Sequence, residues 1–351
     1  MSWLNLLIPS CEMATYSFIE HGIVDNLVGY QVQREIFNTI EKQIDKHFPN
    51  QQNFLVNTIW ITFNEVNLLA AYKNFGHIDN IFFCAALDEC GNIPPLPSNP
   101  NLRVFQLGNI DELGQNNYEF SATAITLHKI FKKYNDSELL LDSNNTVAYL
   151  CYQNKPHVHR QILTKTLLDN KLLDKGIVTL GKYNDQEYMF SELTKLEIDE
   201  PIDEYYDGSR GLTKENPYSL GDINVWRNCF LNVISESSYT SQRFISEKTY
   251  KPIIGMRPFI LNGNPNILQY LQEHDFYTFE EYWPNVNFRE CISMEDTASC
   301  IATVLREVCS KSPMEISLMY NEMLPKLRHN RERFFQHAIE QEHKLNHLFN
   351  I

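Results

Sequence analysis

Short apolar runs alternate with amphipathic segments along the first part of the chain. Apolar side chains from Val24 to Ile40 recur at helical spacing, which predicts that the first 50 residues are mostly helical. Beyond them, apolar runs predict strands at residues 57–63, 78–87 and 103–107, and periodic segments predict helices at 64–75 and 120–134. Strands that alternate with helices are typical of an α/β domain with a mainly parallel sheet.

The alternation starts again near residue 145. A strand at residues 146–152, a helix at 159–173 and a strand at 176–180 form a compact β-α-β unit. Residues 192–207 are acidic and lack apolar periodicity, so we interpret them as a solvated surface loop. The pattern therefore predicts a second α/β domain that begins with this unit.

Loop, helix, strand and loop follow one another in the next part of the chain. An apolar run at residues 225–234 leads into Ser235-Glu236-Ser237-Ser238. Residues 244–248 then open a short helix that reaches Gly255, and Pro258 starts a buried apolar run. This order places ionic groups at a helix N-terminus, where a phosphorylated ligand can be held.

Two further helices complete the pattern, one with an apolar face from Ala298 to Val308 and one that starts near Met314. A chain of 351 residues is long for a single hydrophobic core, so we expect two domains. The predicted division is residues 1–144, residues 145–310, and C-terminal helices at 311–351 that pack back across the domain junction.

The composition is that of an ordinary soluble globular protein, with 43% hydrophobic and 21% charged residues. The formal net charge of −14 argues against a protein whose whole surface binds nucleic acid. A local basic groove stays compatible with this charge, because the electrostatic field near a surface is set by the groups close to it.

The eight cysteines are scattered, and none forms the C-x-x-C spacing of zinc sites and redox motifs. We therefore expect no bound metal and a reduced, cytoplasmic setting. The N-terminus lacks the basic region of a secretory signal, and no stretch approaches the roughly 18 apolar residues of a membrane span. We expect neither feature in this protein.

Three loops of the second domain carry polar groups at one edge of its predicted sheet. In an open α/β sheet, ligands bind outside the carboxyl ends of the strands. The loops at residues 154–160, 235–238 and 244–248 all follow strands or enter helices at that edge. Their side chains suit an anionic nucleotide, and the candidate donor-binding residues are Asn154, His157, Arg160, Glu236, Ser237, Ser246, Glu247 and Lys248.

Each residue type has a chemical reason for this role. Arg160 and Lys248 can pair with pyrophosphate oxygens, and serine hydroxyls and free helix amides can donate to the same oxygens. A carboxylate beside pyrophosphate would be repelled, so Glu236 or Glu247 would instead accept hydrogen bonds from ribose hydroxyls. Taken singly, these residues have a structural reading as well, since Ser246 can simply cap a helix. The three loops together favour a ligand.

The segment from Leu231 to Gly263 resembles the C-terminal half of fucosyltransferase-like glycosyltransferases of the GT-B type. The matching motifs are Val233-Ile-Ser-Glu-Ser-Ser, Phe244-Ile-Ser-Glu-Lys and Gly255-Met-Arg-Pro-Phe-Ile, together with an Arg that opens a helix after the strand Tyr149-Leu-Cys-Tyr. The resemblance covers roughly residues 146–279 and extends to a group of bacterial and viral glycosyltransferase-like proteins. The N-terminal third has no such counterpart.

The resemblance implies two Rossmann-like domains with an interdomain cleft, and a donor nucleotide held by Arg160, Glu236, Glu247 and Lys248. The chain has no motif of a fucosyltransferase acceptor domain, so neither fucose nor GDP is implied. The first domain would then bind the acceptor.

A catalytic base would have to come from that first domain. An inverting transfer needs a carboxylate that takes the proton of the acceptor hydroxyl as the anomeric carbon becomes oxocarbenium-like. Glu65 and Asp88 each follow a predicted strand and are the candidates, although the residue types and positions favour capping or turn roles for each of them. A retaining transfer needs no such base, so the sequence leaves the stereochemistry open.

We therefore predict a glycosyltransferase that moves a hexosyl or pentosyl group from a nucleoside-diphosphate sugar to an acceptor hydroxyl, with no cofactor. The acceptor is a glycan, a lipid-linked glycan, a protein or a modified DNA base, and the net charge disfavours DNA. The alternative is a non-catalytic nucleotide- or glycan-binding module with the same fold, since fold does not fix function.

Overall fold

The structure is a computed structural model of the whole chain. It describes the strands at residues 16–19, 53–57, 80–86, 102–107 and 117–120, and residues 124, 127–128, 134–142, 146–153, 156–181, 188–193, 220, 223–240 and 245–349. The chain divides into two compact units, residues 1–126 with 341–351, and residues 127–340.

The first unit contains a five-stranded sheet in which every pair of neighbours is parallel. The strands follow one another in chain order across the sheet, as β1 (Tyr16–Ile19), β2 (Asn53–Asn57), β3 (Asn80–Ala86), β4 (Leu102–Leu107) and β5 (Asn117–Phe120). The predicted strands at 78–87 and 103–107 are confirmed as β3 and β4.

Three boundaries in this unit differ from the prediction. β1 is a strand inside the stretch predicted to be mostly helical, and β2 ends at Asn57, where the predicted strand began. Residues 58–63 lie outside the described residues. Phe120 ends β5, and helical backbone follows at residues 124, 127 and 128. Short apolar segments fit both the helical and the strand periodicity, so apolar spacing alone does not distinguish a helix from a strand here.

The second unit contains a four-stranded sheet, again with only parallel neighbours. Its strands are β6 (Val147–Cys151), β7 (Ile177–Val178), β8 (Cys229–Ser235) and β9 (Phe259–Asn262), in the spatial order β7-β6-β8-β9. The predicted strands at 146–152 and 176–180 are confirmed. The apolar run at 225–234 is instead divided between α7 (Ile223–Asn228) and β8.

Along the chain, the helices of this unit precede, connect and follow these strands. They are α5 (Asp136–Leu139), α6 (Val158–Asp169), α8 (Glu247–Ile254), α9 (Asn266–Glu273), α10 (Met294–Cys309) and α11 (Pro313–Phe349), with 3₁₀ turns η2 (Leu173–Lys175), η5 (Glu280–Tyr282) and η6 (Phe288–Glu290). The last part of α11, from residue 341, is assigned to the first unit. None of the helices that the structure describes is long and apolar enough to cross a membrane.

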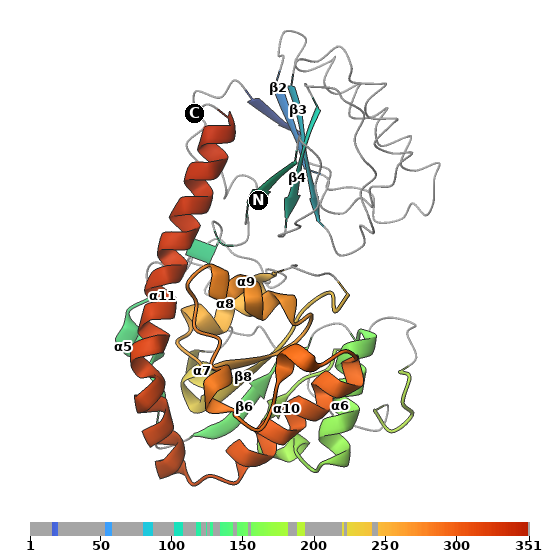
Figure 1. Cartoon of the computed structure of the whole chain (residues 1–351), viewed down its shortest axis with the longest axis vertical. Coiled ribbons are helices and arrows are strands. Elements are labelled where there is room, and N and C mark those ends of the chain that lie inside the picture. Colours follow the sequence, from blue (N-terminus) through green and yellow to red (C-terminus); the bar gives the residue numbers. More distant parts are fainter. Residues whose placement is uncertain are drawn as a thin grey trace. The chain divides into compact units, whose positions relative to one another are not determined.

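The strand order makes the second unit doubly wound. The chain leaves β6 toward β7 on one side and later returns to place β8 on the other side. Right-handed crossovers therefore put α6, which follows β6, and α8, which follows β8, on opposite faces of the sheet. Figure 1 shows α6 beside α10, and α10 also contacts β6 and β9. On the other face, α8 contacts β8, and Tyr250 of α8 packs against Phe334 of α11.

One buried cation joins the ends of three helices. The guanidinium group of Arg257 is 1% exposed, and its Nε donates to the carbonyl oxygen of Trp226 in α7 at 2.8 Å. Its Nη1 donates to Leu139 O in α5 and to Met256 O after α8, each at 2.8 Å. The carbonyl ends of helices carry partial negative charge, so a cation stabilises all three at once.

We predict that Arg257→Met lowers the free energy of unfolding by about 3–5 kcal/mol, because it leaves several buried carbonyl groups without a donor. Urea denaturation followed by circular dichroism measures this loss. Arg289→Met is the matched control, because Arg289 pairs with Glu280 on the surface with 44% of its side chain exposed. Its cost should stay below about 1 kcal/mol. Equal losses for the two variants would contradict the role of Arg257.

Candidate functional site

The strand order of the second unit marks the edge where a ligand is expected. The connections from β6 and β8 leave the sheet in opposite directions, which makes the carboxyl ends of these two strands a topological switch point. Ligands of open parallel sheets bind at that place. The loops predicted to carry donor-binding residues follow β6, follow β8 and enter α8. The structure brings side chains from all three together around Glu236.

The carboxylate of Glu236 is fully buried at the start of α8. Its Oε1 accepts hydrogen bonds from the backbone N–H of Ser246 at 3.1 Å and from the hydroxyl of Thr249. Its Oε2 accepts from Ser246 Oγ at 2.5 Å and from the N–H of Ser237 at 3.2 Å. An ionised carboxylate has about four acceptor positions, and these four donors occupy them.

The main chain of Glu236 is held from the other side of the switch point. Its carbonyl oxygen accepts from Nη2 of Arg160 at 2.9 Å, and the same nitrogen donates to Ser235 O at 3.0 Å. Nε2 of His159 lies 2.9 Å from the carbonyl oxygen of Glu236. Since a carbonyl oxygen can only accept, Nε2 is the donor. Glu236 thus joins α6 through its backbone to α8 through its side chain.

Burial keeps the imidazole of His159 neutral. The ring is 3% exposed, and its pKa is lowered from 6.5 to about 3, first by loss of hydration and then by the charge of Arg160. The hydrogen bond to Glu236 O opposes this shift and is too weak to reverse it. The ring centroid of Tyr239 lies 5.9 Å from that of His159, so the loop after β8 also packs on this ring.

Buried amide and hydroxyl side chains form a second hydrogen-bond network next to Glu236, centred on Ser235. Nε2 of Gln153, the second residue after β6, donates to Thr164 Oγ1 at 2.9 Å, and its Oε1 accepts from Ser235 Oγ at 3.1 Å. Nδ2 of Asn262, the last residue of β9, donates to the same Ser235 Oγ at 3.0 Å. Ser235 lies in the predicted loop at residues 235–238, but we did not predict Gln153 or Asn262. Their positions just past the end of β6 and at the end of β9 were the signal that would have identified them.

The accessible part of the site is formed by Glu247, Lys248 and Ser237. Nζ of Lys248 donates to Glu247 Oε1 at 2.6 Å and to Ser237 Oγ at 3.0 Å. The side chains of Lys248 and Glu247 are 24% and 13% exposed. Burial alone would raise the pKa of Glu247, but the nearby Lys248 and Lys251 together lower it, so this carboxylate is ionised at neutral pH.

The remaining predicted residues divide into two groups. Ser246 is the N-cap of α8, and its hydroxyl accepts from the N–H of Lys248 at 3.2 Å, so its capping role is confirmed. His157 is the exposed N-cap residue of α6, and its ring stacks on that of His159 with centroids 6.0 Å apart. Asn154, Glu65 and Asp88 lie outside the described residues.

Arg160 and Glu236 are buried beneath the accessible residues of the site. Arg160 is 2% exposed and donates to the two carbonyl groups at the end of β8, and the oxygens of Glu236 are used within the protein. Their predicted contacts with a donor stay predictions. Lys248, Glu247 and Ser237 are partly exposed predicted residues at this edge, in addition to the exposed His157.

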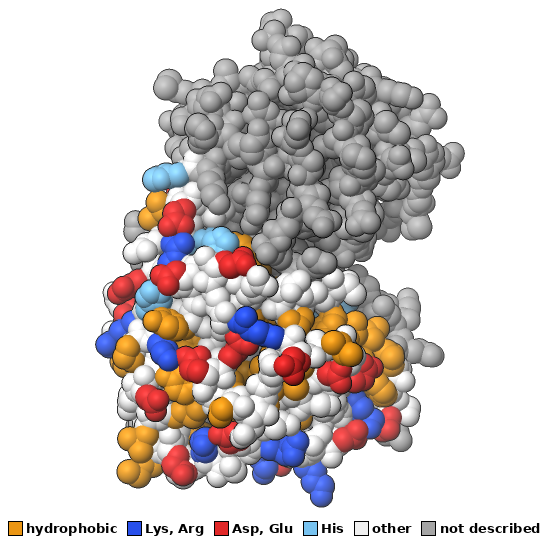
Figure 2. Space-filling model, viewed as in Figure 1, with side chains coloured by type: hydrophobic (Ala, Val, Ile, Leu, Met, Phe, Trp, Pro, Cys, Tyr) orange, Lys and Arg blue, Asp and Glu red, His pale blue; other side chains and the backbone are white. Residues whose placement is uncertain are grey.

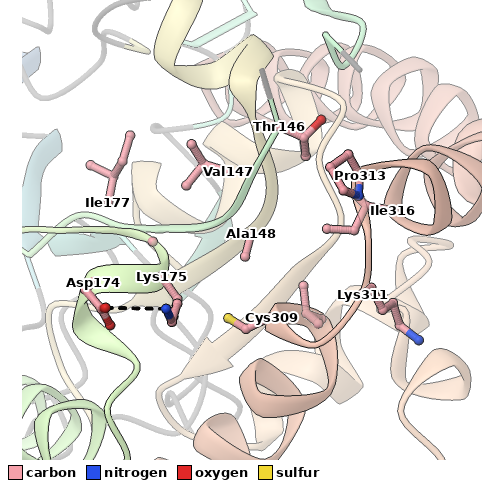
Figure 3. A pocket seen from close by; sticks show the side chains of 12 residues that line it. Thr146, Val147, Ala148, Asp174, Lys175, Ile177, Cys309, Lys311, Pro313 and Ile316 are labelled. Carbon is pink, nitrogen blue, oxygen red and sulfur yellow. Dashed lines mark ion pairs between the residues drawn. The ribbon is translucent and has the colours of Figure 1, made fainter. Parts of the chain in front are cut away.

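A separate hollow lies at the opposite edge of the sheet. It has a volume of about 480 Å³ and is lined by the amino ends of β6 and β7, at Val147 and Ile177, and by the junction of α10 and α11 at Cys309 and Pro313 (Figure 3). Because all the strands are parallel, this hollow lies away from the carboxyl edge that carries Glu236. Within the described residues, no group of three or more His, Cys, Asp or Glu side chains is placed to hold a metal ion.

Comparisons with protein-family models, with curated proteins and with solved structures found no match to this chain. The likeness to fucosyltransferase-like enzymes therefore stays a prediction from the sequence motifs.

We predict that Glu236→Gln destabilises the protein by about 1–3 kcal/mol. In either orientation of the new amide, its NH₂ group faces a backbone N–H, that of Ser246 or that of Ser237, and neither can accept. Chemical denaturation measures the loss, and Glu290→Gln on the exposed turn η6 is the control with no expected effect. A Gln variant as stable as the parent would show that the network does not depend on the carboxylate.

A second prediction concerns pH. Between pH 6.5 and about 3, unfolded His159 binds a proton that folded His159 does not, so acidification favours unfolding. The contribution of His159 is fully present above pH 6.5 and is lost as pH falls, by at most about 1.4 kcal/mol per pH unit. In urea titrations from pH 7 to 4, His159→Gln should flatten this slope because glutamine does not titrate, while its amide keeps a donor for Glu236 O. Parallel slopes for the parent and His159→Gln would contradict the assignment.

Proposed function

We propose that this protein is a glycosyltransferase whose second unit binds a nucleoside-diphosphate sugar. The observation that carries the proposal is the group formed by Lys248, Glu247 and Ser237 at the N-terminus of α8, on the carboxyl edge of a doubly wound parallel sheet. A helix N-terminus attracts anions, and a parallel sheet of this order presents its ligand site at this edge.

In this proposal, the three side chains bind different parts of the donor. The ammonium group of Lys248 and the hydroxyl of Ser237, 3.0 Å apart, bind pyrophosphate oxygens. The carboxylate of Glu247 is ionised and accepts hydrogen bonds from the ribose hydroxyls, since it would repel the phosphates. Binding therefore exchanges the Lys248–Glu247 pair for one contact each with the two halves of the nucleotide.

The buried residues act as a rigid support in this proposal. Arg160 and His159 fix the main chain of Glu236, and Glu236 fixes Ser237 and Ser246 on either side of Lys248. A support that is already hydrogen-bonded within the protein does not have to reorganise when the donor binds, so less binding free energy is lost. His157 is exposed at the start of α6 and is our candidate for a further phosphate contact.

We also propose the GT-B arrangement for the whole chain. Each unit carries a wholly parallel sheet, which is the domain type that this arrangement requires. The catalytic base would come from the first unit, with Glu65 and Asp88 as candidates, and the donor site itself needs no metal ion. On the face of the second unit that Figure 2 shows, acidic and basic side chains are interspersed, so among the described residues this face offers DNA no continuous basic surface.

Isothermal titration calorimetry with UDP-, GDP-, ADP- and dTDP-sugars tests donor binding directly. We expect one class of nucleotide sugar to bind and Lys248→Ala to weaken that binding at least about tenfold, because it removes a charge-assisted contact. Glu247→Gln should weaken it less, since an amide oxygen still accepts from ribose. Lys311→Ala, at the hollow on the opposite sheet edge, is the matched lysine control.

The outcomes separate the proposal from its alternative. Failure of all four donors to bind, or undiminished binding by Lys248→Ala, would contradict the assigned site. Binding with neither sugar transfer to any acceptor nor slow donor hydrolysis would identify a non-catalytic nucleotide-binding module.

A further inference from the structure

Two cysteines at the N-terminal end of α10 lie in direct contact. Cys291 follows η6, and Cys300 lies in the second turn of α10. Their Sγ atoms are 3.3 Å apart. A disulfide bond is about 2.05 Å long, so the two sulfurs need to approach by only about 1.3 Å to be joined. Nine positions separate these residues, which is a spacing that no C-x-x-C motif would reveal.

The surroundings of the pair allow a small reagent to reach it. Cys300 is partly exposed, and Ile292, next to Cys291, is 93% exposed. Of the five cysteines whose side chains the structure describes, Cys151 and Cys229 are buried in strands, and Cys309 lines the hollow at the other sheet edge. The contact between sulfurs therefore marks Cys291 and Cys300 as the pair that can be linked without rearrangement of the fold.

We propose that Cys291 and Cys300 form a reversible dithiol–disulfide pair that exchanges with low-molecular-weight disulfides. The thiolate of Cys300 attacks the reagent disulfide, forms a mixed disulfide and releases one reagent thiol. Cys291 then attacks the Cys300 sulfur and releases the second reagent thiol. In total, two protein thiols are oxidised to one disulfide, and one reagent disulfide is reduced to two thiols.

The protonation state of Cys291 sets the rate of the second step. Burial raises its pKa to about 12, and the hydrogen bond with Cys300 adds to this shift. At neutral pH Cys291 is a thiol, and only the thiolate is the nucleophile. Ring closure should therefore accelerate as the pH rises from 7 to 9, by up to tenfold per pH unit.

The link acts on a segment that contacts the loop after β8. The hydroxyl of Tyr239 donates to Ser293 O at 2.8 Å and lies 2.8 Å from Thr297 Oγ1, and both partners lie between the two cysteines. The ring of Tyr239 packs on His159. A disulfide would close residues 291–300 into a small covalent loop. It would thereby stabilise the start of α10, to which Tyr239 of the loop after β8 is hydrogen-bonded. The contact between the two sulfurs does not depend on which ligand the site binds.

The test incubates the full-length protein with oxidised glutathione at pH 8.5, alkylates the remaining thiols and maps disulfide-linked peptides by mass spectrometry. We expect a link between residues 291 and 300 that dithiothreitol reverses. Cys309→Ser should form the same link. Cys300→Ser should leave Cys291 alkylated. The oxidised parent should melt roughly 5 °C higher than the reduced protein, and oxidised Cys300→Ser should show no such rise.

Two results would overturn the proposal. One is stable glutathione on Cys300 with Cys291 still open to alkylation, which would show that the sulfurs do not meet. The other is a linkage that joins either residue to a different cysteine. A melting temperature that stays the same or falls on oxidation would overturn the stabilising effect on the start of α10, even if the disulfide forms.

Discussion

A single buried carboxylate, that of Glu236, holds the carboxyl edge of the second sheet together. Burying a charge is costly unless it is fully hydrogen-bonded, and four donors from Ser237, Ser246 and Thr249 meet this condition. Three of these four donors come from the start of α8, where the helix dipole also favours a negative charge. Because Arg160 and His159 hold the same residue by its carbonyl oxygen, Glu236 connects both helices that flank the switch point.

The helix α8 has buried ionic groups at both of its ends. Glu236 lies at its N-terminus, and Arg257 binds the carbonyl groups of Gly255 and Met256 just beyond its C-terminus. An eight-residue helix is marginal by itself, so these two charges and its packed face stabilise it. The consequence for function is a rigid helix start, on which Lys248 and Glu247 are presented at a fixed position.

Much of the fold and part of the site were predictable. Continuous apolar runs identified β3, β4, β6 and β7, and the helix after Ser246 began where its capping hydroxyl predicted. The run at 225–234 was divided between α7 and β8 because a short apolar segment fits either period. Prediction grouped Arg160 and Glu236 with Lys248 because all three are polar and lie in loops that follow strands or enter helices at one sheet edge. Their burial separates them, and burial depends on contacts with residues more than 70 positions away.

The sequence by itself determined the α/β class, the parallel alternation and the three polar loops at one edge, because these follow from local periodicity and from chain order. Tertiary structure alone decided which polar groups face inward and which remain accessible. It also brought the sulfurs of Cys291 and Cys300 to 3.3 Å, although their spacing gave no signal. The physical reason is the same in both cases. A side chain's partners are set by the packing of helices against the sheet, and the pattern along the chain does not specify that packing.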